Sequence, residues 1–100
     1  MKPAVFHREA RAELDEAVAY YERQKPGLGT TLLSIVEEAV SRIEQNPQLG
    51  ARYKRTPFRH FLVRRFPYVI FYAERESGLW IVAVAHGKRR PDYWRKRRIP

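Results

Sequence analysis

The apolar residues of this 100-residue chain change their spacing near the middle, and that change limits the folds that the chain can adopt. In residues 8–24 and 28–45, apolar side chains recur every three or four positions, which predicts two amphipathic helices. After Gly50 the spacing shortens, and Val, Ile, Phe, Tyr and Trp become frequent, which predicts strands. The sequence therefore predicts an α+β fold, with the helices packed on an antiparallel sheet.

The breaks between the elements are marked by proline and glycine. Pro26-Gly27 ends the first helix, and Asn46-Pro47 ends the second because the residue before proline avoids the helical conformation. The connection between the helices is only a few residues long, so we expect an antiparallel helical hairpin. The predicted strands cover residues 3–6, 60–65, 68–74 and 79–86, with a hairpin turn at 76–78.

The last strand is apolar on both faces. Strict alternation places Trp80, Val82 and Val84 on one face and Ile81, Ala83 and Ala85 on the other. A strand of this kind needs cover on both sides, so we expect it at the centre of the sheet.

Charge is divided unevenly along the chain. Residues 1–50 hold six Lys/Arg against eight Asp/Glu, whereas residues 51–100 hold fourteen against three, a balance of +11. Aromatic residues are interleaved with these cations, a combination typical of contact with single-stranded nucleic acid. The second half of the chain is therefore expected to meet a polyanion or an acidic partner.

Composition excludes several other classes. The chain has no cysteine, which excludes disulfides and thiolate metal sites. Its longest apolar run, Leu79 to Ala85, is far shorter than a membrane span, and no signal peptide is apparent. No glycine-rich phosphate loop and no carboxylate cluster in the basic half point to a metal or organic cofactor. We therefore expect one cytoplasmic domain over residues 1–100, without a cofactor and without a membrane contact.

Short motifs along nearly the whole chain resemble the RelE/ParE superfamily of bacterial toxins. In chain order they are Tyr20-Tyr21-Glu22, Gly27-Leu28-Gly29, Val36-Glu37, Asn46-Pro47, the run from Phe66 to Tyr72, Ala83-Val84-Ala85-His86 and Arg90-Pro91-Asp92-Tyr93-Trp94. The resemblance implies the toxin of a type II toxin–antitoxin pair, with a helical hairpin on an antiparallel sheet. It also implies a small antitoxin that masks the toxin in a hetero-oligomer.

The superfamily contains two mechanisms, and both remain open. RelE-like members cut mRNA on the ribosome without a metal. ParE-like members poison DNA gyrase and have no known hydrolytic chemistry. For the nuclease, the candidate catalytic residues are His86, Arg89 and Tyr93, because such an enzyme needs a base, an acid and a cation for the phosphorane charge. Tyr93 would serve as the acid if a nearby cation lowered its pKa.

Two departures weigh against the nuclease. RelE-like nucleases carry lysines on the strand that corresponds to residues 60–65, and this chain has none there; Val69 stands where those enzymes have an arginine. A gyrase poison needs only a complementary surface, so the pattern favours the ParE-like mechanism. The alternatives are mRNA cleavage and a non-toxic interaction module. For any target, the candidate contact residues are Arg59, Arg64, Arg65, Lys88, Arg90, Trp94, Arg95 and Arg97; Trp94 is also a candidate lid over the sheet edge.

Overall fold

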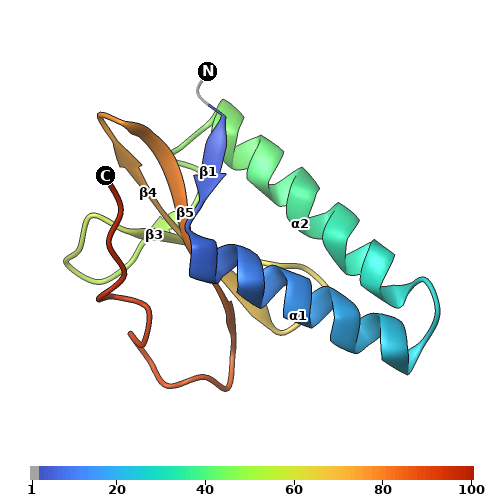
Figure 1. Ribbon diagram of the computed structural model, residues 1–100. Coiled ribbons are helices and arrows are strands. Elements are labelled where there is room, and N and C mark those ends of the chain that lie inside the picture. Colours follow the sequence, from blue (N-terminus) through green and yellow to red (C-terminus); the bar gives the residue numbers. More distant parts are fainter. Residues whose placement is uncertain (1–2) are drawn as a thin grey trace.

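The computed structural model describes residues 3–100 and has an α+β architecture. In chain order the elements are β1 (Ala4–Phe6), α1 (Arg8–Gln24), α2 (Leu28–Gln45), β2 (Ala51–Arg52), β3 (Arg59–Leu62), β4 (Tyr68–Arg75) and β5 (Gly78–His86). The five strands form one sheet in the order β1-β5-β4-β3-β2. Figure 1 shows the two helices side by side as an antiparallel hairpin, and the C-terminal segment returning along the sheet. The predicted fold class, helical hairpin and central last strand are confirmed.

Three details of the predicted sheet are wrong. The strand β2 was not expected, because its two residues are too few for a periodic pattern. The strand β1 pairs with β5 in parallel, so the sheet is mixed and not wholly antiparallel. The strand β3 ends at Leu62 and does not continue to Arg65, because the chain turns there: Val63 N–H donates to the Tyr68 carbonyl at 3.0 Å, and Arg65 takes a φ of 71°.

A bulge interrupts the alternation of β5. Phe71 pairs with Ala83, but the next residue of β4, Tyr72, pairs with Ile81, so Val82 is an extra residue in the ladder. The predicted alternation is therefore wrong beyond this point. Val82 and Val84 lie on opposite faces of the sheet, whereas strict alternation would have put them on the same face.

Each face of the sheet carries its own core. The helix-side core lies beneath α1 and α2, and its fully buried members include Leu14, Leu32, Val36, Ile43, Ile70, Tyr72 and Ile81. The opposite face is covered by the loop before β3 and by the C-terminal segment, which together form a smaller tail-side core. Its buried members are Phe58, Phe71, Ala73, Val82, Ala83, Ala85 and Trp94. Both faces of β4 and β5 are thus buried, as their apolar composition requires.

The two helices approach each other closely at Gly29. A Cβ atom added there would lie 2.3 Å from the Val18 carbonyl oxygen and 2.9 Å from the Glu22 Cβ. We expect Gly29→Ala to lower the free energy of unfolding by about 1–3 kcal/mol, because the helices must separate to admit the methyl group. Urea unfolding followed by circular dichroism measures the change. Gly87→Ala is the control: its nearest neighbour would be 3.6 Å away, so an effect within about 0.5 kcal/mol is expected.

Candidate functional site: a basic end of the sheet beside a tyrosine-lined cleft

Two loops bring basic side chains together at one end of the sheet. The loop between β3 and β4 and the loop after β5 are neighbours, since Leu62 pairs with Val69 and Tyr68 pairs with His86. The Gly87 N–H also donates to the Pro67 carbonyl at 2.7 Å. We call the exposed cations of these two loops the basic end; they are Arg64, Arg65, Lys88, Arg89 and Arg90. Five of the predicted site residues therefore lie close together at the surface.

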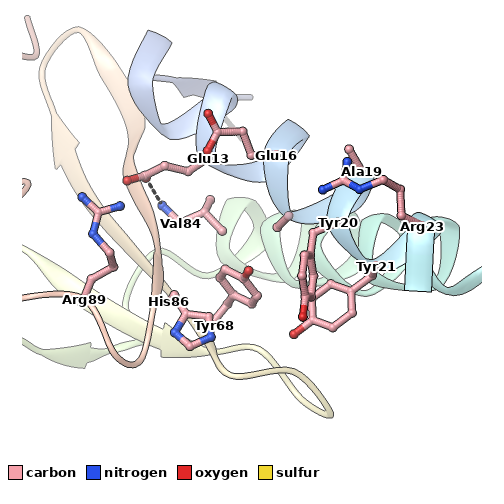
Figure 2. Close-up of a pocket in the computed structure, with 11 residues that line it drawn as sticks. Glu13, Glu16, Ala19, Tyr20, Tyr21, Arg23, Tyr68, Val84, His86 and Arg89 are labelled. Atoms are coloured by element: carbon pink, nitrogen blue, oxygen red, sulfur yellow. Dashed lines mark hydrogen bonds between the residues drawn. The ribbon is translucent and has the colours of Figure 1, made fainter. Parts of the chain in front are cut away.

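A cleft of about 640 Å³ lies between α1 and this end of the sheet. Its walls carry the rings of Tyr20, Tyr21 and Tyr68, together with His86 and Arg89. Figure 2 shows Arg89 and the Tyr20–Tyr21 pair toward opposite ends of the cleft, with Tyr68 and His86 between them. Tyr20 is 48% exposed, so much of its ring is open to solvent in the wall of the cleft.

The bulge at Val82 determines which face His86 occupies. Because the bulge shifts the alternation by one residue, Val84 and His86 lie on the helix side of the sheet, in the wall of the cleft. The His86 ring meets the Tyr68 ring edge-on at 5.1 Å, and its Nδ1 accepts the Lys88 N–H at 3.0 Å. The Nδ1 lone pair of His86 is therefore engaged by the backbone of the loop that follows β5.

Glu13, near the middle of α1, gathers four hydrogen bonds from a distant part of the chain. Its Oε1 accepts from Val84 N–H at 2.9 Å and from Arg97 Nη1 at 3.0 Å. Its Oε2 accepts from Arg97 Nη2 at 2.9 Å and from the Tyr93 hydroxyl. Burial raises the pKa of Glu13, but the hydrogen bonds from Arg97, Tyr93 and Val84 outweigh it, and the pKa is lowered. Nothing in the sequence pattern singled out Glu13.

The environment of Tyr93 opposes the role of a general acid. Burial raises the pKa of its hydroxyl, and the hydrogen bond to the Glu13 carboxylate raises it further. Arg89, whose guanidinium lies 3.9 Å from the ring centroid, and Arg97 lower the pKa only in part. The condition under which Tyr93 could act as an acid, a pKa lowered by a nearby cation, is therefore not met, and the hydroxyl donates to Glu13.

Trp94 is a core residue. Its side chain is 1% exposed and packs against Phe71, Phe58 and Tyr53, with ring centroids 4.4, 4.9 and 5.5 Å away. The prediction that Trp94 contacts a target is therefore wrong, because no surface of the ring remains to be covered. Its alternative role as a lid is closer to the structure, although it covers a face of the sheet and not its edge.

Two of the predicted contact arginines are bound within the fold. Arg97 is only 10% exposed and is engaged by Glu13, and Arg59 donates to the Gly50 carbonyl at 2.8 Å. These two cations are therefore structural in this conformation. Arg95 stays largely exposed, 3.9 Å from Asp92, and joins the exposed Lys96 and Arg98 as a second group of cations.

The bonds to Glu13 predict a dependence of stability on pH. Since the folded-state pKa of Glu13 lies below its ordinary value of 4.5, its contribution is complete above pH 4.5 and is lost as the pH falls through the folded-state pKa. Arg97 keeps its charge throughout this range, and it also lies 3.9 Å from the exposed carboxylate of Glu9. We expect wild-type protein to lose more stability than Glu13→Gln between pH 6 and pH 3, measured by urea unfolding. Parallel curves for the two proteins would contradict this.

Residues 4–91 match the family described as "ParE toxin of type II toxin-antitoxin system, parDE". The chain is 31% identical over 87 residues to Toxin ParE2 of Mycobacterium tuberculosis, a match that spans 86% of this chain and 82% of that protein; the ParE2 proteins of two strains give the same result. The chain belongs to the ParE toxin family. The resemblance to the RelE/ParE superfamily that the motifs indicated is thereby confirmed. Within that superfamily the chain is a ParE-like type II toxin.

The ParE fold is found in a solved structure as well. A chain of the chromosomal ParDE TA system from P. aeruginosa superposes with a TM-score of 0.75 at 19% identity, over 86% of this chain and 96% of the other. The match to the ParE family profile stops at residue 91, so Tyr93, Trp94 and Arg97 lie beyond it. Neither helix in residues 3–100 has the length and apolar character that crossing a bilayer requires.

Proposed function

We propose that this ParE-family toxin arrests growth by poisoning DNA gyrase, and that a cognate antitoxin neutralises it by covering its basic surface. The observation that carries the proposal is the state of the candidate catalytic groups. Tyr93 donates its hydroxyl proton to Glu13, and the Nδ1 of His86 accepts the Lys88 N–H. A metal-free ribonuclease needs a free base and a free acid beside the phosphate, whereas a gyrase poison needs only a complementary surface.

The basic end supplies such a surface. Its five cations lie on two adjoining loops. Arg64 lies 4.0 Å from Glu38, and both of these side chains are exposed to solvent. Exposed cations contribute little to the stability of the fold itself. They remain available for the phosphates of the DNA in a gyrase complex, or for acidic side chains of a protein partner.

Two assays separate the mechanisms. With purified toxin, gyrase and supercoiled plasmid, we expect linear DNA to accumulate after detergent and protease treatment, which is the signature of a stabilised cleavage complex. In cells, we expect the 5′ ends of mRNAs to remain unchanged minutes after induction. New ends in phase with codons would show the ribosome-dependent nuclease, and unimpaired growth with inert gyrase would show the non-toxic module.

The antitoxin is tested through the neighbouring genes. We expect an adjacent short reading frame to encode a small DNA-binding protein that co-purifies with the toxin as a hetero-oligomer. Co-expression is expected to restore growth and to abolish plasmid linearisation. A neighbouring protein that fails to bind would remove the antitoxin part of the proposal and leave the gyrase part intact.

A further inference from the structure

Glu13 links the middle of α1 to the C-terminal segment across a large distance in sequence. Its hydrogen bond to Tyr93 spans 80 residues and its bonds to Arg97 span 84. Both charged partners are shielded, with 13% of the Glu13 side chain and 10% of the Arg97 side chain exposed. Removing one member of such a pair leaves the other buried without a partner, so the two groups hold each other in place strongly.

The link closes the edge of β5 that β1 leaves without a neighbouring strand. The strand β1 covers β5 only as far as Ile81, whose carbonyl accepts the His7 N–H at 2.8 Å. Beyond it, the Val84 N–H donates to Glu13 and the Val82 carbonyl accepts from Arg97 Nη1 at 3.0 Å. Figure 2 shows the first of these bonds as a dashed line. The ion pair thus satisfies backbone groups that an added strand would otherwise satisfy.

The same link controls where exposed cations lie. The Tyr93 ring, fixed through its hydroxyl, supports the Arg89 guanidinium at 3.9 Å from its centroid. Arg97 lies within the run 95–98, so anchoring its side chain fixes the backbone that carries the exposed Arg95, Lys96 and Arg98. Cations held in one arrangement bind a target without the entropy loss of ordering flexible side chains and backbone.

We propose that Glu13 is a positioning residue for target binding, which acts through Tyr93 and Arg97 to hold Arg89 and the cations of residues 95–98 in a single binding arrangement. The inference rests on the proposed function for the identity of the target. The arrangement of the side chains does not depend on that function. Glu13 lies inside the segment matched by the family, whereas Tyr93 and Arg97 lie outside it. The link therefore joins the segment matched by the family to the C-terminal segment beyond it.

The test compares Glu13→Gln with Glu37→Gln, an exposed residue of α2 that loses the same charge. We expect Glu13→Gln to need at least about tenfold more toxin for half-maximal plasmid linearisation, with faster tryptic cleavage within residues 95–98. Glu37→Gln is expected to stay within about twofold of wild type. Tyr93→Phe removes the hydroxyl bond to Glu13 but leaves the Arg97 bonds, so its loss is expected to lie between those of wild type and Glu13→Gln. A Glu13→Gln toxin of full potency would overturn the inference.

A double-variant cycle separates positioning from a general loss of structure. If Glu13 acts in part through Arg89, then the loss of potency in Glu13→Gln combined with Arg89→Gln will be smaller than the product of the two single losses. Losses that multiply would show independent roles and would overturn the inference. If Glu13→Gln does not fold, Arg97→Lys takes its place with the same expectations, because lysine keeps the charge but cannot form the two parallel bonds to Glu13.

Growth arrest in cells distinguishes this inference from the proposed target. Wild-type toxin that arrests growth without affecting gyrase would remove the proposed target, while weaker arrest by Glu13→Gln would still support positioning toward another target. Equal linearisation by wild type and Glu13→Gln would keep the gyrase function and remove the positioning role. A wild-type protein that neither arrests growth nor acts on gyrase would remove both.

Discussion

Replacing Trp94 with alanine is expected to lower the free energy of unfolding by about 3–5 kcal/mol, the largest loss of stability among the changes considered. The indole is 1% exposed and makes close ring contacts with Phe71, Phe58 and Tyr53. Its removal leaves a cavity in the smaller of the two cores, where few other side chains are available to fill it. Because small domains have only about 5–15 kcal/mol of total stability, a large part of it would be lost.

Urea unfolding followed by far-UV circular dichroism measures this loss without using the deleted fluorophore. Trp94→Phe, which keeps an aromatic ring, is expected to lose less than half as much. Tyr20→Ala serves as the control, because that ring is 48% exposed and its removal should change stability by less than about 1 kcal/mol. Equal effects at Trp94 and Tyr20 would show that the C-terminal segment does not cover the sheet in solution.

Replacing Lys88, Arg89 and Arg90 together with glutamine is expected to weaken binding to the gyrase–DNA complex on the order of 10- to 100-fold at physiological salt. Each exposed cation that meets a phosphate releases a counterion, so the loss should be accompanied by a shallower salt dependence, with the slope of log K against log salt reduced by up to about 3. All three side chains are exposed, so the fold should remain intact. Titration of fluorescein-labelled toxin between 50 and 200 mM salt would measure both quantities.

The matched control removes three exposed cations from the helical half, with Arg8, Arg11 and Lys25 changed to glutamine. Arg11 is paired with the exposed Asp15 at 3.2 Å, a contact expected to contribute little to stability. The net charge of this control equals that of the variant changed at Lys88, Arg89 and Arg90. A purely nonspecific charge effect would therefore weaken the binding of both variants equally. That outcome would remove the basic end as the contact surface.

The helices and the central strand could be predicted because each obeys a local rule. Pro26-Gly27 and Asn46-Pro47 end the helices through backbone restrictions that act within one or two residues. The observed bounds of α1 and α2 are those that the periodicity predicted. The central position of β5 followed from its two apolar faces, a property that the burial of both faces confirms.

The bulge at Val82 could not be predicted from the same pattern. A run of apolar residues allows either alternation, so the sequence does not reveal where one residue is added to the ladder. The one-residue shift that this bulge causes matters for the site, because it places His86 in the wall of the cleft. The partner of β1 was also hidden, since three residues carry too little information to select a neighbouring strand or its direction.

The roles of Trp94 and Arg97 depend on contacts between distant parts of the chain. In the sequence both residues belong to a basic, aromatic segment that is typical of a nucleic-acid contact. In the structure, Trp94 meets the ring of Phe71 and Arg97 meets the carboxylate of Glu13. Composition correctly predicted that this segment carries exposed cations. Only the fold, however, shows which cations are exposed and which are paired within the protein.

The pairing of β1 with β5 has a consequence for the timing of folding. Ala4 pairs with Leu79 and Glu13 binds Arg97, so β1 and α1 cannot make these contacts until the later segments have been made. Contacts so distant in sequence form slowly, and they cannot form at all while the chain is incomplete. The basic end and its supporting link are therefore absent from the nascent chain. The arrangement proposed for target binding can therefore form only after residues 79–97 have been made.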